Sequence, residues 1–348
     1  MLIDGIHIPL TVPFTRDGEM YLRKLEYNVG RYSLGPAAGL VALTSECEGA
    51  ALSDEEIGEA LRVIGASAAP EKVLVAAIAK DSVRGVLAIA RQAEAAGFDA
   101  VLVDAPPQWA RLNNEEDVLL FFRAVADASP LPVMLGSEMD ALGFPISVEM
   151  IGVLARHPNV YGMYDDELSV ERYQAIAKAT REVKREVAVT TVFAPVTGRM
   201  LRRGQAEGGL VSAESLVVGG AAVAAEAKAL KTRTKTVGFQ VMSSGSARGL
   251  VELLAAGVPG AMPALSACAP QGCYEAFAAF KDGDPALAAE KGERLLEADA
   301  AILGLGISAV KYGCDWNGFY GGPPRLPRLP LNAEGRAVVE RVLAGIRN

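Results

Sequence analysis

Short apolar runs alternate with longer amphipathic segments along most of this chain. The runs cover residues 6–12, 39–43, 73–78, 100–103, 132–135, 160–163, 239–242 and 260–262. Helical spacing of apolar residues marks most of the intervals, for example residues 83–96, which Gly97 closes. Continuous apolar strands alternating with amphipathic helices indicate a parallel sheet that is buried on both faces.

Eight strand units in one run predict a closed (β/α)8 barrel, an α/β fold of the TIM type, more than an open doubly wound sheet. No GxGxxG fingerprint follows the first strand, which weakens a dinucleotide-binding interpretation. Residues 285–303, 308–314 and 332–346 have helical patterns beyond the last strand. We therefore expect a barrel over residues 1–282 and a C-terminal helical region, or annex, over residues 283–348.

The interval between the sixth and seventh predicted strands is too long for one βα unit with short loops. A helix is predicted for residues 169–186, an additional strand for 187–193 and another short segment for 212–219. We interpret residues 187–238 as an insertion. We favour a surface excursion that pads an oligomer interface. The alternative is a lid over the barrel mouth. The mouth is the end of the barrel where the C-termini of the strands meet.

Composition narrows the class of protein. Hydrophobic residues make up 51% of the 348 residues. The chain has 34 basic and 42 acidic residues, which give a net charge of −8. This negative charge argues against nucleic acid or an anionic membrane as a partner. The four cysteines show no close CxxC pair, so no disulfide framework is expected. The first residues lack the pattern of a secretory signal, and no apolar tract is long enough to span a bilayer. We expect a cytoplasmic protein.

Polar residues follow the predicted strands, and parallel barrel strands deliver such residues to one mouth. The stretch NVYGMYDDE at residues 159–167 shows this most clearly, because its apolar run leads directly into Tyr164. The expected rim collects several carboxylates and one main cation: Glu46, Glu48, Asp81, Asp104, Glu138, Asp165, Asp166 and Lys80.

The acidic rim allows two interpretations. Several carboxylates could hold a divalent metal that activates a carbonyl group or water, or they could bind a cationic substrate. Alternatively, some of them cap helices and others face solvent, and Asp81 and Glu48 are plausible caps. The carboxylates come without histidines at metal-ligand spacing, so the sequence favours the second interpretation.

Other candidate groups are few. Lys80 could be a relocated imine lysine or could pair with a rim carboxylate such as Asp104. Tyr164 could act as a general acid or hydrogen-bond donor, or it could fill space in the rim. The two histidines, His7 and His157, are expected toward the opposite end of the barrel in structural roles. Cys47 has no histidine near it in sequence, which argues against a thiolate nucleophile.

Three stretches resemble the dihydrodipicolinate synthase / N-acetylneuraminate lyase family of class I aldolase-type barrels. LVALTSECEGAALSDEE (residues 40–56) is similar to the family's glycine-threonine-threonine-glycine-glutamate loop. HPNVYGMYDD (residues 157–166) is similar to the segment that holds the Schiff-base lysine. The tail GISAVKYGCDWNGFYGGPPRLPRLPL (residues 306–331) resembles 4-hydroxy-2-oxoglutarate aldolase-like members.

The resemblance also shows which family residues this chain has exchanged. The imine-forming lysine corresponds to Tyr164, which has no amine and cannot form an imine. The paired threonines correspond to Ser45, which keeps a hydroxyl, and Glu46, whose carboxylate would repel a substrate carboxylate. The proton-relay tyrosine corresponds to Gly136. The tyrosine of a neighbouring subunit falls near Gln108, and the carboxylate-binding arginine falls on Ala141.

The resemblance implies a carbon–carbon lyase, either an aldolase or a dehydratase, that acts on a small oxo acid or sugar acid. The expected catalytic residues are Tyr164 and Ser45. The expected substrate-binding residues are Glu46, Glu48, Lys80, Asp104, Gln108, Gly136, Glu138 and Asp165.

Family membership requires no cofactor, although a divalent metal is possible, and it implies a homodimer or homotetramer. Two alternatives stay open. One is a metal- or Tyr-assisted enzyme on the same barrel, and the other is a non-catalytic barrel that binds a small molecule or a partner protein.

Overall fold

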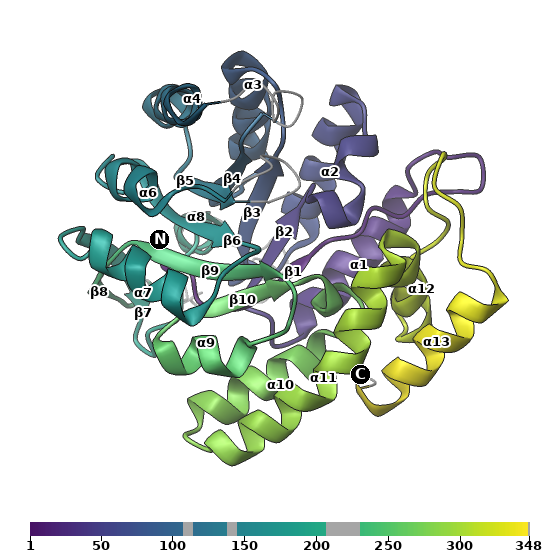
Figure 1. Ribbon diagram of the computed structural model, residues 1–348. Coiled ribbons are helices and arrows are strands. Elements are labelled where there is room, and N and C mark those ends of the chain that lie inside the picture. The colour runs from purple at the N-terminus through teal and green to yellow at the C-terminus, as the bar shows by residue number, and fades with distance from the viewer. Residues whose placement is uncertain (107–113, 138–144, 207–229, 347–348) are drawn as a thin grey trace, which may run out of the picture.

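A closed barrel of eight parallel strands forms the centre of the molecule (Figure 1). The computed structural model describes residues 1–106, 114–137, 145–206 and 230–346. Around the barrel the strands follow the order β1-β10-β9-β6-β5-β4-β3-β2. They are β1 (Gly5–Pro9), β2 (Gly39–Ala42), β3 (Val73–Ile78), β4 (Ala100–Asp104), β5 (Val133–Ser137), β6 (Val160–Asp165), β9 (Gln240–Gly245) and β10 (Gly260–Pro263).

Helices surround the barrel, and further helices follow it at the C-terminal end of the chain (Figure 1). Those that follow barrel strands are α1 (Leu22–Leu34), α2 (Asp54–Ser67), α3 (Val83–Ala95), α4 (Glu115–Ala128), α6 (Val148–Leu154), α7 (Val170–Ala179), α9 (Leu250–Ala256) and α10 (Pro270–Lys281). The C-terminal region adds α11 (Pro285–Leu305), α12 (Ile307–Trp316) and α13 (Ala333–Leu343). The predicted (β/α)8 barrel with a C-terminal helical region is confirmed.

Alternation along each strand divides the apolar side chains between two cores. In β3, Val73, Val75 and Ala77 belong to the cluster inside the barrel. Leu74, Ala76 and Ile78 belong to the larger cluster between the strands and the helices. Successive strand residues point to opposite faces of a sheet, so a strand with apolar residues throughout supplies both cores at once.

The long interval between β6 and β9 contains a separate two-stranded sheet. β7 (Arg185–Thr190) pairs antiparallel with β8 (Thr232–Val237), and α8 (Gly198–Ala206) lies between them in sequence. The helix predicted for residues 169–186 was too long, because α7 ends at Ala179 and the alternating sequence REVAVT begins a strand. The segment predicted at 212–219 lies outside the described residues.

The described part of this insertion contacts the end of the barrel opposite the mouth. Arg199 of α8 donates hydrogen bonds to the carbonyls of Gly97 and Lys72, which precede β4 and β3. Arg185 of β7 donates to the carbonyls of Ala155 and His157, which precede β6. These contacts do not support the interpretation of the insertion as a lid over the mouth.

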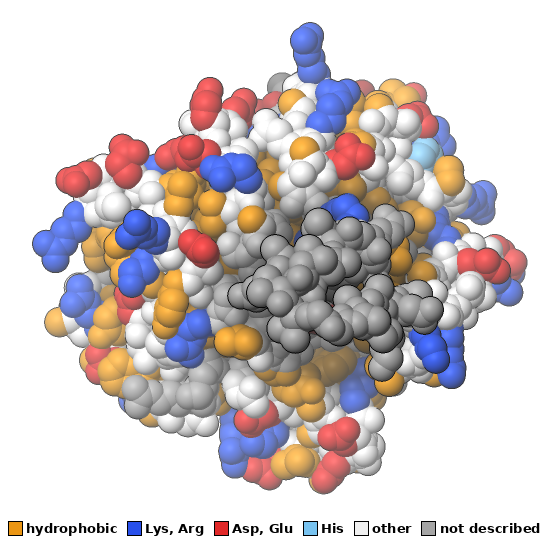
Figure 2. Space-filling view, turned by 180° about the vertical axis from the view of Figure 1, so that it is seen from behind, with side chains coloured by type: hydrophobic (Ala, Val, Ile, Leu, Met, Phe, Trp, Pro, Cys, Tyr) orange, Lys and Arg blue, Asp and Glu red, His pale blue; other side chains and the backbone are white. Residues whose placement is uncertain are grey.

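The surface seen from behind carries both acidic and basic side chains, interspersed over its described part (Figure 2). Among the helices that the structure describes, none combines the length and the apolar character needed to cross a bilayer.

Candidate functional site

Tyr164 lies inside the barrel. The sequence predicted that the sixth strand ends at Met163, but β6 continues to Asp165, so Tyr164 is a strand residue. Its side chain is 1% exposed and belongs to the same buried cluster as Leu102, Met134 and Met242. The phenol is therefore in the barrel interior and not on the outer rim.

A hydrogen bond joins Tyr164 to His7 of β1. The phenol oxygen lies 2.8 Å from His7 Nδ1, and both side chains are buried. A Cβ at Gly39, which pairs with His7 across β1 and β2, would lie 2.6–2.8 Å from three atoms of the imidazole. Only glycine at position 39 leaves room for this ring, so the neighbouring strand is shaped to hold it.

Sequence analysis missed this role of His7. It placed both histidines toward the opposite end of the barrel, whereas the structure brings His7 into contact with Tyr164. One signal was available: His7 is a polar residue between Ile6 and Ile8 in an otherwise apolar strand. Successive residues of a strand point to opposite faces of the sheet. If Ile6 and Ile8 face the helices, His7 between them must face the barrel interior.

Burial keeps both members of the pair neutral near pH 7. Desolvation lowers the pKa of His7 from 6.5 to about 4, and the nearby backbone carbonyl of Asp4 opposes this shift only in part. Desolvation also raises the pKa of the Tyr164 phenol well above its ordinary value. The contact is thus a hydrogen bond between two neutral groups and not a tyrosinate–imidazolium pair.

The buried imidazole predicts a loss of stability in acid. Between pH 6.5 and pH 4 the unfolded chain takes up a proton at His7 that the folded chain does not, so the free energy of unfolding falls as the pH falls. Compared with His7→Leu, the wild type should lose about 3 kcal/mol more between pH 7 and pH 4, measured by urea unfolding. Equal losses in the two proteins would contradict a neutral buried His7.

Asp104 and Tyr164 lie on either side of Gly136 in one row of paired strand residues. Asp104 of β4 pairs with Gly136 of β5, which pairs with Tyr164 of β6. A Cβ at position 136 would lie 1.8 Å from Asp104 Oδ1, so the carboxylate occupies the space that any larger side chain there would need. Asp104 is 5% exposed. A carboxylate and a phenol thus reach the same part of the barrel interior.

Glu48 is not a rim residue that could bind a substrate. Its side chain is fully buried and forms an ion pair with Lys311 of α12 at 2.5 Å. It also accepts a hydrogen bond of 2.9 Å from the backbone nitrogen of Arg325. Burial lowers the pKa of Lys311, and the Glu48 carboxylate opposes that shift. The pair joins the loop after β2 to the C-terminal region.

Asp165 and Lys80 also have structural partners. Asp165 follows Tyr164 directly and therefore faces the helices, where its buried carboxylate pairs with Arg172 of α7 at 2.8 Å. Lys80 Nζ lies 2.7 Å from Asp54 Oδ1 at the start of α2, so its partner is this carboxylate and not Asp104, the example that the sequence offered. Neither residue is placed with Tyr164 and Asp104.

The remaining predicted site residues divide by position. Ser45 is exposed and begins a short 3-10 turn after β2, at the mouth. The side chain of Glu46, together with Gln108, Glu138 and Ala141, lies outside the described residues. Within the described part of the chain, no three His, Cys, Asp or Glu residues are grouped so that they could hold a metal ion.

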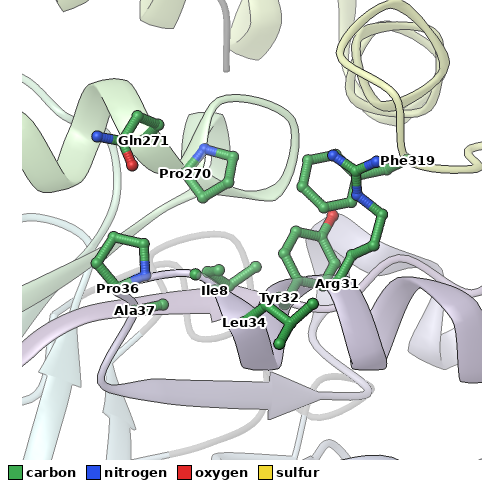
Figure 3. A pocket seen from close by; sticks show the side chains of 10 residues that line it. Ile8, Arg31, Tyr32, Leu34, Pro36, Ala37, Pro270, Gln271 and Phe319 are labelled. Atoms are coloured by element: carbon green, nitrogen blue, oxygen red, sulfur yellow. The ribbon is translucent and has the colours of Figure 1, made fainter.

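An apolar cavity of about 430 Å³ lies outside the barrel interior (Figure 3). Its lining includes Ile8 and residues of α1 and α10. The Arg31 guanidinium lies 5.0 Å from the ring centroid of Phe319, which stacks on Tyr32 at 4.2 Å. None of the predicted site residues lines this cavity, so it is separate from the Tyr164 site.

Comparisons with known proteins agree with the fold. Residues 2–224 match the dihydrodipicolinate synthetase family. The 4-hydroxy-tetrahydrodipicolinate synthase of Xanthomonas axonopodis pv. citri is 31% identical over 176 residues, which cover 51% of this chain and 58% of that protein. The chain thus spans little more than half the length of this curated relative.

Two full-length matches are more distant. The L-threo-3-deoxy-hexylosonate aldolase of Aspergillus niger is 24% identical, with 97% of this chain and 93% of that protein covered. The structure of a dihydrodipicolinate synthase from Bacillus anthracis superposes with a TM-score of 0.77 at 20% identity and covers both chains completely.

Proposed function

Because the chain belongs to the dihydrodipicolinate synthetase family, we propose that it is a lyase that works without an imine at position 164. The reaction is an aldol cleavage or a dehydration, and the substrate is a small oxo acid or sugar acid. The relatives support this class, since one of them is named L-threo-3-deoxy-hexylosonate aldolase. Tyr164 stands where the family's lysine would be, and a phenol cannot form an imine.

The observation that carries the proposal is the row Asp104–Gly136–Tyr164. In an aldol cleavage, Asp104 takes the proton of the substrate's hydroxyl group. The adjacent carbon–carbon bond then breaks, an aldehyde leaves, and the electron pair moves onto the oxo-acid half as an enolate. The same proton returns from Asp104 to the enolate carbon. Tyr164 orients a substrate oxygen, and the Ser45 hydroxyl binds another at the mouth.

Borohydride trapping tests the missing imine. Incubation with pyruvate and borohydride should leave the intact mass of the protein unchanged, because Tyr164 has no amine and Lys80, which follows β3, is paired with Asp54. A family member that keeps its lysine serves as the positive control. A mass increase that maps to any lysine would contradict the proposal.

A second candidate function is a barrel that binds a small molecule without turning it over. The 1% exposure of Tyr164 favours it, because a phenol packed among Leu102, Met134 and Met242 is hard for a reacting group to reach, whereas a molecule held at the mouth need not touch it. A panel of oxo acids and sugar acids would separate the two functions. Stabilisation by a ligand that is recovered chemically unchanged supports the second function, whereas formation of an aldehyde supports the first.

The metal-assisted alternative and the oligomeric state remain predictions. The described residues offer no cluster of metal ligands, so we expect turnover to survive dialysis against a chelator. Family membership leads us to propose a homodimer or homotetramer, which light scattering would measure.

A further inference from the structure

We propose that His7 is a positioning residue that accepts the hydrogen bond of the Tyr164 phenol at Nδ1, so that the phenol oxygen meets a ligand as an acceptor. The inference deepens the proposed function and rests on it, because it assumes that Tyr164 contacts the substrate. Its basis is the 2.8 Å contact between two side chains that share the barrel interior.

The first step concerns the tautomer of His7. A neutral imidazole has one N–H and one lone pair, so only one of its nitrogens can donate. Nε2 is buried and has no hydrogen-bond partner of normal geometry among the described residues. The backbone of Asp4 raises the pKa of His7, which is the effect of a carbonyl beside a ring N–H. A carbonyl attracts an N–H, and Tyr164 already occupies Nδ1, so the proton belongs on Nε2.

The second step concerns the phenol. With the proton of His7 on Nε2, Nδ1 is an acceptor and the Tyr164 O–H must donate to it. The phenol has one proton, so its oxygen can then only accept from a ligand. Proton transfer within the pair is unfavourable, because burial disfavours the charged form of both groups. His7 therefore orients Tyr164 without relaying its proton.

The third step concerns the ligand. The Asp104 carboxylate, on the other side of Gly136, is also an acceptor. Two acceptors in one row of strand residues favour a substrate that brings hydroxyl donors next to its reacting carbon. A 2-oxo acid without hydroxyl groups, such as pyruvate, has only acceptor oxygens at neutral pH and can donate a hydrogen bond to neither group.

Nitrogen-15 NMR of histidine-labelled protein tests the tautomer without any substrate. The chain has two histidines, so His157→Gln assigns the spectrum. We expect a pyridine-type Nδ1 and a pyrrole-type Nε2 for His7, and a shift of the Nδ1 resonance in Tyr164→Phe, where the donor is gone. A pyrrole-type Nδ1, or no response to Tyr164→Phe, would overturn the inference.

Two substitutions of His7 test the positioning role. His7→Asn keeps an acceptor near the place of Nδ1 and should retain most of the turnover, whereas His7→Leu should lose roughly a hundredfold in kcat because the phenol is no longer oriented. Equal losses in both variants, or no loss in His7→Leu, would show that the residue acts only through packing. Unchanged turnover in Tyr164→Phe would instead refute the proposed function, whatever the tautomer of His7.

Discussion

Tyr164→Phe should reduce turnover by roughly 10²- to 10⁴-fold, the range expected when a group that handles a substrate proton or its hydrogen bond is lost. The substitution removes one oxygen and leaves the aromatic ring in its cluster with Met134 and Met242. The fold should therefore persist, with a loss of about 1–3 kcal/mol because the buried His7 Nδ1 loses its partner. Steady-state rates and urea unfolding of the same preparation measure the two effects separately.

Tyr161→Phe is the matched control, because it removes the same oxygen from the same strand. Tyr161 lies near the opposite end of β6, where the guanidinium of Arg185 sits 5.2 Å from its ring centroid. We expect its turnover to equal that of the wild type. If Tyr164→Phe also keeps full turnover, Tyr164 only fills space in the barrel interior, and its proposed role in catalysis is wrong.

Lys311→Met should lower the free energy of unfolding by about 3–5 kcal/mol, the cost of leaving one charge of a buried ion pair without its partner. The side chains of Lys311 and Glu48 are 1% and 0% exposed and lie 2.5 Å apart, so solvent cannot replace the lost ammonium group. Lys311 also donates to the carbonyl of Pro323 at 3.0 Å. Urea unfolding would measure the change.

A double substitution separates the stability lost by leaving a buried charge unpaired from the stability lost through changed packing. Glu48→Gln combined with Lys311→Met removes both charges and should recover a large part of the lost stability. The exposed pair of Arg341 and Glu297 is the control, and Arg341→Met should cost at most about 1 kcal/mol. A Lys311→Met protein as stable as the control would contradict a charged pair in the interior.

The candidate site could be predicted from the sequence only in part. The positions of Asp104 and Tyr164 at the ends of apolar runs were visible, because strand ends meet at the barrel mouth. Asp165 and Glu48 followed the same rule and were misplaced. Whether a side chain enters the barrel depends on the register of each strand, and a difference of one residue turns it toward the helices.

The sequence by itself determined the architecture and the absence of an amine at position 164. Apolar runs alternating with amphipathic segments require a parallel sheet covered by helices, and Tyr164 rules out an imine at its position whatever its surroundings. Only the tertiary structure decided which side chains the buried polar residues contact. The hydrogen bond between His7 and Tyr164 joins residues 157 positions apart, and Lys311 reaches Glu48 from the C-terminal region. Such contacts depend on how the barrel closes, and no local pattern in the chain records that geometry.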